Sequence, residues 1–410
     1  MFKNSFNLKN VAIMIACFAV CTVFSGCEKE EDPINPPPPP PETEAIELIS
    51  PITVNTTLKD LGLPIDYVFK GGYLIVKDNA VLTIEPGVTI QFTSTNGDGT
   101  LSIDDGATIV AIGTAEKPIQ FIGNGTQKGS WGTVQVNTNS DNKFKYCEFI
   151  NGGGSYNGAL SMRNIGGTGP RISVQYCKII GSKKYGFDTY GNDFTIDAFD
   201  NNTITGGEDA PVSLYNLKMA AKFDMTSNLT GNANDYVRIE RNENMVNTTL
   251  NETTVPYYCV GNWSINKTLT INEGVTICMH TDVSWSDSEM GKIVVNGTQA
   301  KPVTFTRLPG MTYYWGSYGG LRFSRNNGSE LNWCVMEYVK NDMAAIDLSY
   351  EGYITLNNCT IRNNQGYGVN KGRGNHCDVV VNHSGTNERF SNNALGNVIL
   401  CNSDVVSVLP

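Results

Sequence analysis

The chain has 410 residues, of which 40 % are apolar and 17 % are charged, a composition that excludes a mainly disordered protein. Its formal net charge of −10 at pH 7 argues against a nucleic-acid-binding surface, so we expect no nucleic-acid partner. Glycine is abundant, with 42 residues, and runs of strong helix formers are scarce, which favours short strands separated by turns.

Residues 1–26 have the organisation of a secretory signal. A basic start precedes the apolar stretch 11–24, which is too short to span a bilayer as a helix. Two small residues then stand directly before Cys27. This ending is similar to the lipobox of bacterial lipoproteins, although Phe24 stands where leucine is usual, and the resemblance implies that lipid is attached to Cys27. The alternative is an ordinary signal in which Cys27 has no special role.

Residues 27–45 read as a tether. The six prolines 36–41 lack N–H donors and favour polyproline II, a semi-rigid spacer. The acidic start CEKEED resembles the export signal of outer-membrane lipoproteins in Bacteroidota-type bacteria. That resemblance implies an exported lipoprotein of the outer membrane that faces the cell exterior. A plain solvated tether is the alternative.

A strand–turn–strand unit follows and recurs along the chain. Residues 82–92 read LTIEPGVTIQF and residues 269–279 read LTINEGVTICM, with apolar residues at alternate positions on either side of a turn. Glycine occupies the turn in both, at Gly87 and Gly274, where a type II turn requires positive φ. A unit this short buries its apolar face only by stacking on its neighbours, which predicts a solenoid.

A second pattern places a Cys or Asn two residues before an apolar residue. It occurs in YCEFIN (146–151), YCKIIG (176–181) and NNTITG (201–206), and again at Cys334 and Cys359. We interpret these Cys and Asn side chains as an inward ladder with a packing role. Eight cysteines follow Cys27 without a CxxC pair, so a zinc site has little support; whether any of them is oxidised stays open.

These units are duplicated in tandem. GTAEKPIQF (113–121) matches GTQAKPVTF (297–305), and Trp131 matches Trp315. We expect one repeat block at residues 46–250 and a second at 251–410, as a continuous stack or as two stacks that meet near residue 250.

A parallel stack of units of this length is a β-helix. LTIEPGVTI, GTAEKPIQF, the Trp131-Gly132 step and NANDYVRIE (232–240) resemble right-handed parallel β-helix lipoproteins of Bacteroidota-type bacteria, within the pectate-lyase-like β-helix superfamily. The resemblance implies an all-β, right-handed parallel β-helix from about residue 46 onward. It implies little about activity, because most such proteins have none assigned.

The sequence gives little support to catalysis. The Gly-His-Gly step of polygalacturonase-like enzymes is missing, and the Asp104-Asp105 pair falls in a turn. Pectate-lyase-like enzymes stack acids on successive units to hold Ca²⁺, but the outward positions after the Cys or Asn marks form no acidic column. Four aspartates near Lys183 and Lys184 keep a lyase open as an alternative: Asp188, Asp193, Asp197 and Asp200.

One stretch departs from the repeat. Where the first copy has LSIDDG, the second has WSDSEM (285–290). A looped-out unit is the simple interpretation, and a ligand or cation cluster is the other. The candidate residues for that cluster are His280, Asp282, Trp285, Asp287 and Glu289.

Aromatic side chains suggest a ligand surface. The stretch 313–320 reads YYWGSYGG, and exposed rings could stack on sugar faces. Trp315 matches Trp131 and is therefore expected to belong to the fold. The candidate contact residues are Tyr313, Tyr314, Trp315 and Tyr318, together with Tyr146 and Tyr176, which share the outward phase.

We therefore expect a non-catalytic protein, anchored to the outer membrane by lipid on Cys27, that presents a surface to a glycan or a protein partner. We expect no catalytic residue, metal or other cofactor. Two alternatives stay open. One is a polysaccharide lyase or glycoside hydrolase acting on acidic glycans, with Ca²⁺ in the lyase case, and the other is a structural, adhesin-like stalk.

Overall fold

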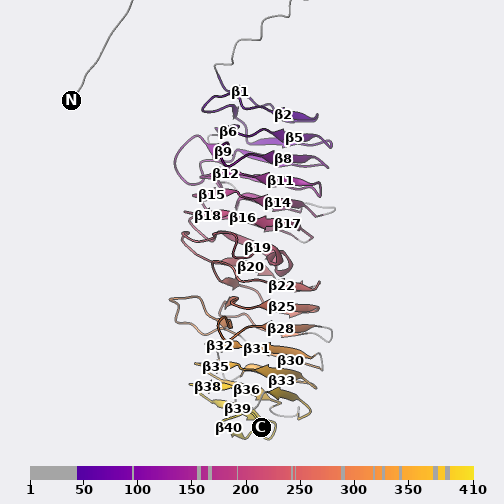
Figure 1. The fold of residues 1–410 in the computed structure, drawn as a ribbon, viewed down its shortest axis with the longest axis vertical. Coiled ribbons are helices and arrows are strands. Elements are labelled where there is room, and N and C mark those ends of the chain that lie inside the picture. Colours follow the sequence, from indigo (N-terminus) through magenta and orange to yellow (C-terminus); the bar gives the residue numbers. More distant parts are fainter. Residues whose placement is uncertain are drawn as a thin grey trace, which may run out of the picture. The chain divides into compact units, whose positions relative to one another are not determined.

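A computed structural model describes residues 44–410 except for a few short segments. Those segments are 95–96, 155–157, 165–168, 192, 242, 245, 288–290, 317–318, 326–327, 341–343, 373–376 and 384–387. The described residues form an all-β parallel solenoid of about 12 turns with almost no helix, which confirms the expected fold class (Figure 1). The signal segment and Cys27 lie outside the described residues. Within the described part, no helix is long and apolar enough to cross a membrane.

Each turn of the solenoid, here called a coil, contributes one strand to each of three stacked sheets. The N-terminal coils, β1 to β19, build two sheets of their own and start a third. The seven-stranded sheet contains β1 (Ile46–Glu47), β3 (Tyr67–Phe69), β6 (Thr89–Phe92), β9 (Ile119–Gly123), β12 (Cys147–Ile150), β15 (Lys178–Ile180) and β18 (Thr203–Thr205). The first six-stranded sheet contains β2 (Thr56–Leu58), β5 (Val81–Ile84), β8 (Thr108–Ile112), β11 (Asn142–Lys145), β14 (Arg171–Gln175) and β17 (Thr195–Asp200).

The thirteen-stranded sheet passes through both parts of the solenoid. It contains β4 (Tyr73–Val76), β7 (Thr100–Ile103), β10 (Val134–Val136), β13 (Gly158–Arg163), β16 (Tyr185–Tyr190), β19 (Val212–Asn216), β20 (Val237–Arg241), β23 (Tyr257–Cys259), β26 (Thr276–Met279), β29 (Val303–Thr306), β32 (Cys334–Glu337), β35 (Thr360–Arg362) and β38 (Arg389–Ser391).

The C-terminal coils, β20 to β40, complete two further sheets. The second six-stranded sheet contains β22 (Thr248–Leu250), β25 (Thr268–Asn272), β28 (Lys292–Asn296), β31 (Ser329–Asn332), β34 (Tyr353–Asn357) and β37 (Val380–His383). The eight-stranded sheet contains β21 (Glu243–Asn244), β24 (Trp263–Ile265), β27 (Trp285–Asp287), β30 (Leu321–Ser324), β33 (Ala344–Ser349), β36 (Tyr367–Lys371), β39 (Gly396–Leu400) and β40 (Val405–Val406).

The core lies inside the stack and follows the alternation of the sequence. In the unit at 82–92, Leu82, Ile84, Ile90 and Phe92 are all buried, and Thr83 between them is half-buried. Neighbouring coils place like residues over one another: Phe149 pairs with Phe121 in register, and their rings stack with centroids 5.0 Å apart. The apolar column therefore continues from coil to coil without a gap.

The two turn glycines have the positive φ that the sequence predicts. Gly87 and Gly274 have φ of 93° and 76°, the left-handed region that side chains with a Cβ rarely adopt. A Cβ added at Gly87 would also lie 2.7 Å from Oδ2 of Asp60, so the side chain of Asp60 would have to move.

The cysteines of the predicted ladder are buried and free, which confirms their packing role. Cys147, Cys177, Cys334 and Cys359 are each at most 1 % exposed, and Asn202 extends the ladder by accepting a hydrogen bond from the backbone N of Cys177 (2.9 Å). Burial raises the pKa of the Cys334 thiol well above its ordinary value, so this thiol stays protonated.

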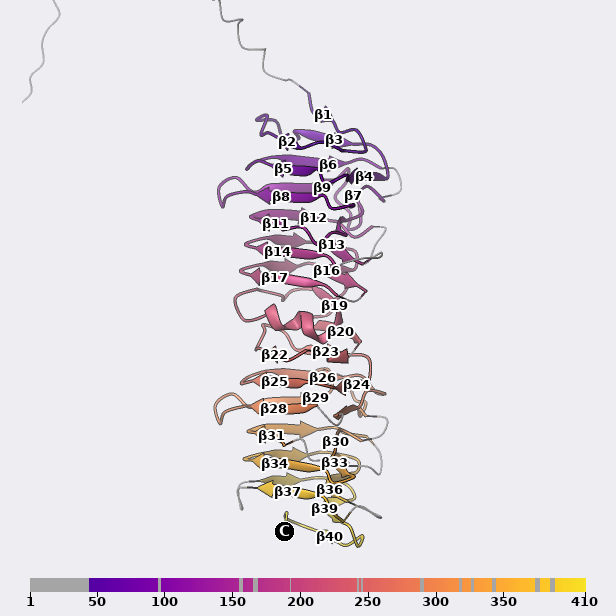
Figure 2. The same ribbon diagram turned by 90° about the vertical axis from the view of Figure 1, so that its right-hand side faces the viewer.

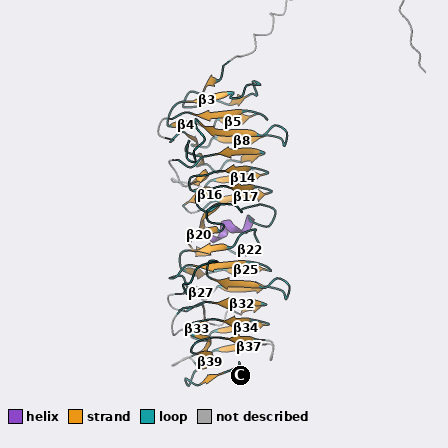
Figure 3. Cartoon of the chain, turned by 90° about the vertical axis from the view of Figure 1, so that its left-hand side faces the viewer, coloured by secondary structure: helices purple, strands orange, loops and turns teal. Residues whose placement is uncertain are grey.

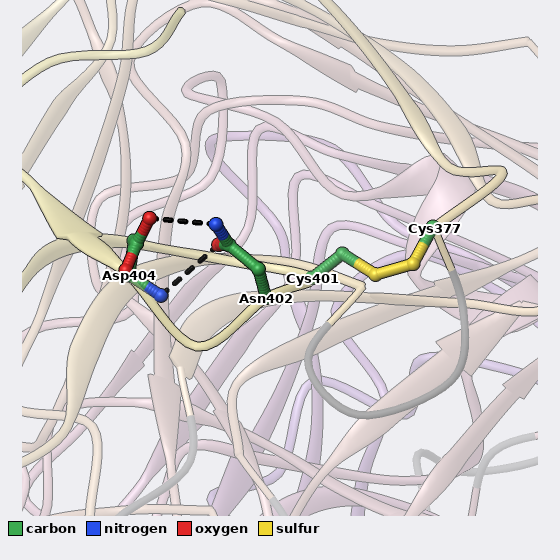
Figure 4. The surroundings of a disulfide bond; sticks show 4 residues. All are labelled: Cys377, Cys401, Asn402 and Asp404. Carbon is green, nitrogen blue, oxygen red and sulfur yellow. Dashed lines mark hydrogen bonds between the residues drawn. A yellow bond between two sulfur atoms is a disulfide. The ribbon is translucent and has the colours of Figure 1, made fainter.

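The C-terminal end of the stack is closed by a disulfide and a short hairpin. Cys377 and Cys401 are bonded, with Cα atoms 5.1 Å apart (Figure 4). Beside them, Nδ2 of Asn402 donates to Oδ2 of Asp404 (2.6 Å), which holds the turn between β39 and β40. Among the described strands, β39 and β40 make the one antiparallel pair, which covers the edge that a further coil would extend.

The pairing of strands changes at the seam between the two parts. The one helix of the described residues, the 3₁₀ helix η1 (Leu217–Lys222), lies between β17 and β22 (Figure 3). The sequence VNTTL occurs at both 54–58 and 246–250, where it includes β2 and β22. Strands β6 and β26 are equivalent by sequence, yet β26 shares its sheet with β7, the strand that follows β6. At the seam, strands of the second repeat therefore join the sheet of the strand that follows their counterpart in the first repeat. The stack itself continues through the seam (Figure 2).

Candidate binding site

In five coils, a single left-handed residue bends the chain at one corner. Only Tyr146 separates β11 from β12, and only Trp333 separates β31 from β32. Both are in the left-handed region, with φ of 50° and 48°. Their backbone N–H groups donate to the coil that follows, to the carbonyl of Gln175 (3.2 Å) and of Asn357 (2.8 Å). The corner is therefore a fixed part of the ladder.

Asparagine is the residue that this backbone conformation favours. Asn201 and Asn358 occupy the same corner in other coils, with φ of 55° and 58°. At three further positions an aromatic residue takes the place of asparagine: Tyr146, Tyr176 and Trp333. A bulky side chain with positive φ costs about 1–3 kcal/mol, so these three aromatics oppose the local backbone preference. Such strain is commonly associated with function.

The two tyrosines of the N-terminal coils form one aromatic surface. Their rings stack with centroids 4.9 Å apart and an interplanar angle of 23°. The ammonium group of Lys145 lies 5.7 Å from the ring centroid of Tyr146 and 5.5 Å from that of Tyr176, within cation–π range. Tyr176 is 41 % exposed, so a ring face remains accessible to a ligand.

A row of polar side chains runs beside the tyrosines. Gln120, Glu148 and Lys178 occupy matching positions on β9, β12 and β15. Oε2 of Glu148 accepts a hydrogen bond from Gln120 (2.9 Å), and Oε1 accepts one from the ammonium of Lys178 (2.9 Å). Burial alone would raise the pKa of Glu148, but the hydrogen bonds and the charge of Lys178 lower it below its ordinary value.

A depression of about 200 Å³ opens between these groups and the preceding loop. Its lining includes Thr114, Pro118, Tyr146, Glu148, Tyr176 and Lys178. The arrangement suits a sugar ring, which has apolar C–H groups on its faces and hydroxyl groups around its edge. Tyrosine rings can cover the apolar face, and the amide, carboxylate and ammonium groups can pair with the hydroxyls. Glu148 is ionised and ion-paired, whereas a general acid requires a raised pKa.

The other predicted aromatic contacts lie in different surroundings. Trp315 is fully buried, and its Nε1 donates to the carbonyl of Glu337 (2.8 Å), so its place in the fold is incompatible with ligand contact. Tyr313 is half-buried, and its hydroxyl donates to the carbonyl of Met279 (3.1 Å). Tyr314 is half-buried near the guanidinium of Arg307, 5.7 Å from its ring centroid. Tyr318 lies outside the described residues.

The structure corrects one interpretation of residues 280–289, that of a looped-out unit. Trp285 is fully buried and stacks on Trp263 with centroids 4.1 Å apart, and β27 pairs with β24 and β30. The unit is therefore part of the stack and is not looped out, because the large indole fills the core that smaller residues fill elsewhere. His280 is half-buried and Asp282 is exposed. The side chain of Asp287, and Glu289 as a whole, lie outside what the structure describes.

The four aspartates of the lyase alternative are divided between two sheets and the loop that connects them, which contains Asp193. Asp188, in β16, is 2 % exposed and accepts hydrogen bonds from Ser161 and from the backbone of Gly158. Asp197, in β17, pairs with Arg171 at 2.6 Å. Asp193 pairs with Lys218 (3.4 Å), and Asp200 accepts from Gln175 (2.9 Å). Among the described residues, no three His, Cys, Asp or Glu side chains gather in a way that could hold a metal ion.

Comparison with known proteins identifies the class of the fold. Residues 54–191 match the family model described as a pectate-lyase like beta helix domain. The matched segment contains the site at Tyr146 and Tyr176, and it confirms the resemblance to the pectate-lyase-like β-helix superfamily. No curated protein and no solved structure matches the chain.

One residue of the corner was not expected from the sequence. Tyr146 and Tyr176 stand out because a tyrosine precedes Cys147 and Cys177. Trp333 precedes Cys334 in the same way. The equivalent residue of the next coil is Asn358, so no pair of aromatic residues draws attention to Trp333. Alignment on the cysteines would have revealed it.

Proposed function

We propose that this protein is a non-catalytic, glycan-binding β-helix protein whose binding surface is the corner at Tyr146 and Tyr176. The observation that carries the proposal is the pair of stacked, accessible tyrosines at positions where the backbone favours asparagine. Within the fold, these rings recover only part of that strain, by stacking on each other and by their contact with the ammonium group of Lys145. A ligand that stacks on them provides the compensating free energy.

The proposal extends to location. A lipid on Cys27, followed by the proline-rich tether of residues 27–45, would hold the β-helix away from the outer membrane on the exterior side. There it can meet polysaccharides that do not cross the membrane. Digestion of intact cells with an external protease tests this location, and a protein that stays fully protected would exclude it.

The binding site is tested by replacing both tyrosines with the residue that the corner favours. In the full-length protein, Tyr146→Asn with Tyr176→Asn should weaken binding at least tenfold, measured calorimetrically against soluble β-mannan and xylan. The thermal unfolding midpoint should stay the same or rise, because asparagine relieves strain of about 1 kcal/mol or more at each position.

Tyr350→Asn is a matched control. Tyr350 is also an exposed tyrosine with positive φ, 47°, but it lies after β33, away from this corner. It should show the same effect on stability and none on binding. Unchanged affinity in the double variant, with wild-type binding established, would contradict the proposed site.

The enzymatic alternative is tested by measuring whether the protein shortens polysaccharide chains. Wild-type protein incubated with the same polysaccharides and with polygalacturonate, with and without Ca²⁺, should leave their chain lengths unchanged. Shortened chains would show that the protein is a lyase or hydrolase and would direct attention to Asp188.

A further inference from the structure

We infer that the C-terminal coils carry a second sugar-binding site, centred on Trp333, and that the two sites hold one uncharged polysaccharide chain together. The inference rests on the proposed function and extends it to a second site, a ligand class and a binding mode.

The second site occupies the same place in the fold as the first. A depression of about 360 Å³ lies between the loop after β28 and strands β32, β35 and β38. Its lining residues Pro302, Trp333, Val335, Asn358 and Thr360 correspond in the duplicated sequence to Pro118, Tyr146, Glu148, Tyr176 and Lys178. Two depressions at equivalent corners point to a feature that the duplication copied.

Trp333 has the properties of the tyrosines of the first site. It is half-buried with φ of 48°, and the next coil has Asn358 in the same conformation, with φ of 58°. Tryptophan has the largest ring face for stacking, so one residue here can supply the area that two tyrosines supply in the first site.

The polar groups around both depressions favour an uncharged sugar. The polar lining of the second depression consists of the amides and hydroxyl of Gln299, Asn358 and Thr360 and of one charged group, the guanidinium of Arg389. In the first, the charge of Lys178 is matched by Glu148 at 2.9 Å. The protein as a whole carries a formal net charge of −10, which repels a polyanion. Amide and hydroxyl groups in such linings can form hydrogen bonds with the hydroxyl groups of a neutral sugar.

The two sites lie on one side of the solenoid. Strands β12, β15 and β18 and strands β32, β35 and β38 share the left-hand column of Figure 1. The path from β11 to β31 passes through β14, β17, η1, β22, β25 and β28, which makes seven steps. At about 4.8 Å per step the sites are roughly 34 Å apart. A polysaccharide of greater length can reach both, and the second contact then becomes intramolecular.

Calorimetry with β-mannan oligosaccharides of increasing length tests the inference on the full-length protein. Short oligosaccharides should bind two per protein chain. Oligosaccharides long enough to span the sites should bind one per chain, at least 100-fold more tightly. Binding should change little between 50 and 500 mM salt, because an uncharged ligand is not subject to screening. A preference for polygalacturonate that falls steeply with salt would overturn the ligand class.

Three variants separate the sites. Trp333→Asn should reduce the stoichiometry for short ligands from two to one and abolish the gain with length, while Trp333→Tyr, which copies the first site, should retain both. Tyr146→Asn with Tyr176→Asn should have the same effect as Trp333→Asn. If Trp333→Asn leaves stoichiometry and length dependence unchanged while the tyrosine variant abolishes binding, the second site is disproved and the proposed function stands. If no variant alters binding, both are disproved.

Discussion

At the scale of single residues, backbone conformation separates structural positions from candidate functional ones. The corner before Cys147 and Cys334 requires positive φ, and its natural occupant is the asparagine found at Asn201 and Asn358. Aromatic side chains at this corner increase the strain without filling the core, because they lie outside the sheets. The sequence shows which residues are aromatic, but only the backbone angles show that the fold does not favour them there.

Asp188 makes the stability of the fold depend on pH. Burial raises the pKa of this carboxyl group to about 6 from an ordinary value of 3.8, although Ser161 and nearby cations oppose the shift. The folded protein therefore retains a proton that the unfolded chain has already released between about pH 4 and 6. Stability falls as the pH rises through this window, and the loss is complete above about pH 6.

Replacing Asp188 by asparagine should remove that loss. Asn370 already occupies the equivalent position in the C-terminal coils, where its Nδ2 donates to Asp347 at 2.5 Å. At pH 7, Asp188→Asn should raise the free energy of unfolding by up to roughly 3 kcal/mol, which is 2.2 pKa units converted to free energy. At pH 4 the gain should vanish. Urea unfolding across pH 4 to 7.5 measures both, and a gain of equal size at all pH values would contradict the ionisation of Asp188.

At the scale of elements, two buried tryptophans tie neighbouring coils together. Nε1 of Trp131 donates to the carbonyl of Ile150 (2.7 Å), and Nε1 of Trp315 donates to the carbonyl of Glu337 (2.8 Å). Each indole thus connects the loop before a strand of one sheet with the end of a strand in another sheet. The duplication of the sequence has copied the contact as well as the residues.

The two tryptophans should therefore contribute equally to stability. Trp131→Phe and Trp315→Phe each remove an indole hydrogen bond and leave space in the core, and each should lower the free energy of unfolding by about 2 kcal/mol. Trp263→Phe is the matched control: Trp263 is 1 % exposed, and within the described residues its Nε1 has no hydrogen-bond partner. Urea unfolding should show a smaller loss for this control, and three equal losses would mean that volume, and not the hydrogen bond, stabilises these positions.

At the scale of the whole solenoid, stability depends on how the ends are closed. Each coil contacts only its neighbours, so the stack can unravel from its last coil inward. The disulfide between Cys377 and Cys401 spans 24 residues of the last coils, and β40 covers the exposed edge of β39. These two features oppose fraying at the C-terminal end.

Removal of the disulfide should loosen that end and leave the rest intact. Cys377→Ser with Cys401→Ser should destabilise the last coil by about 3 kcal/mol, the loop-closure value for a segment of this size. Hydrogen exchange should become faster at the amides of Val398 and Ile399 in β39, while amides of β5 keep their protection. Uniformly faster exchange along the solenoid would show that the coils unfold as one unit.

The sequence by itself determined the fold class, because the burial of apolar residues at every second position leaves a short unit no stable state except a stack. It also determined the turn glycines, the ladder of buried cysteines and the duplication, since each depends on a local pattern repeated at a fixed spacing. The sequence also identifies Tyr146 and Tyr176, because each stands directly before a cysteine of the repeated pattern.

Only the tertiary structure decided which of the candidate residues can meet a ligand. Trp285 and Tyr146 are both aromatic and both break a simple pattern, yet one fills the core and the other lies at an outer corner. The shift of strand pairing at the seam and the place of Trp333 likewise depend on contacts between coils that are far apart in the sequence. No local pattern records such contacts, because they arise from the way the coils stack.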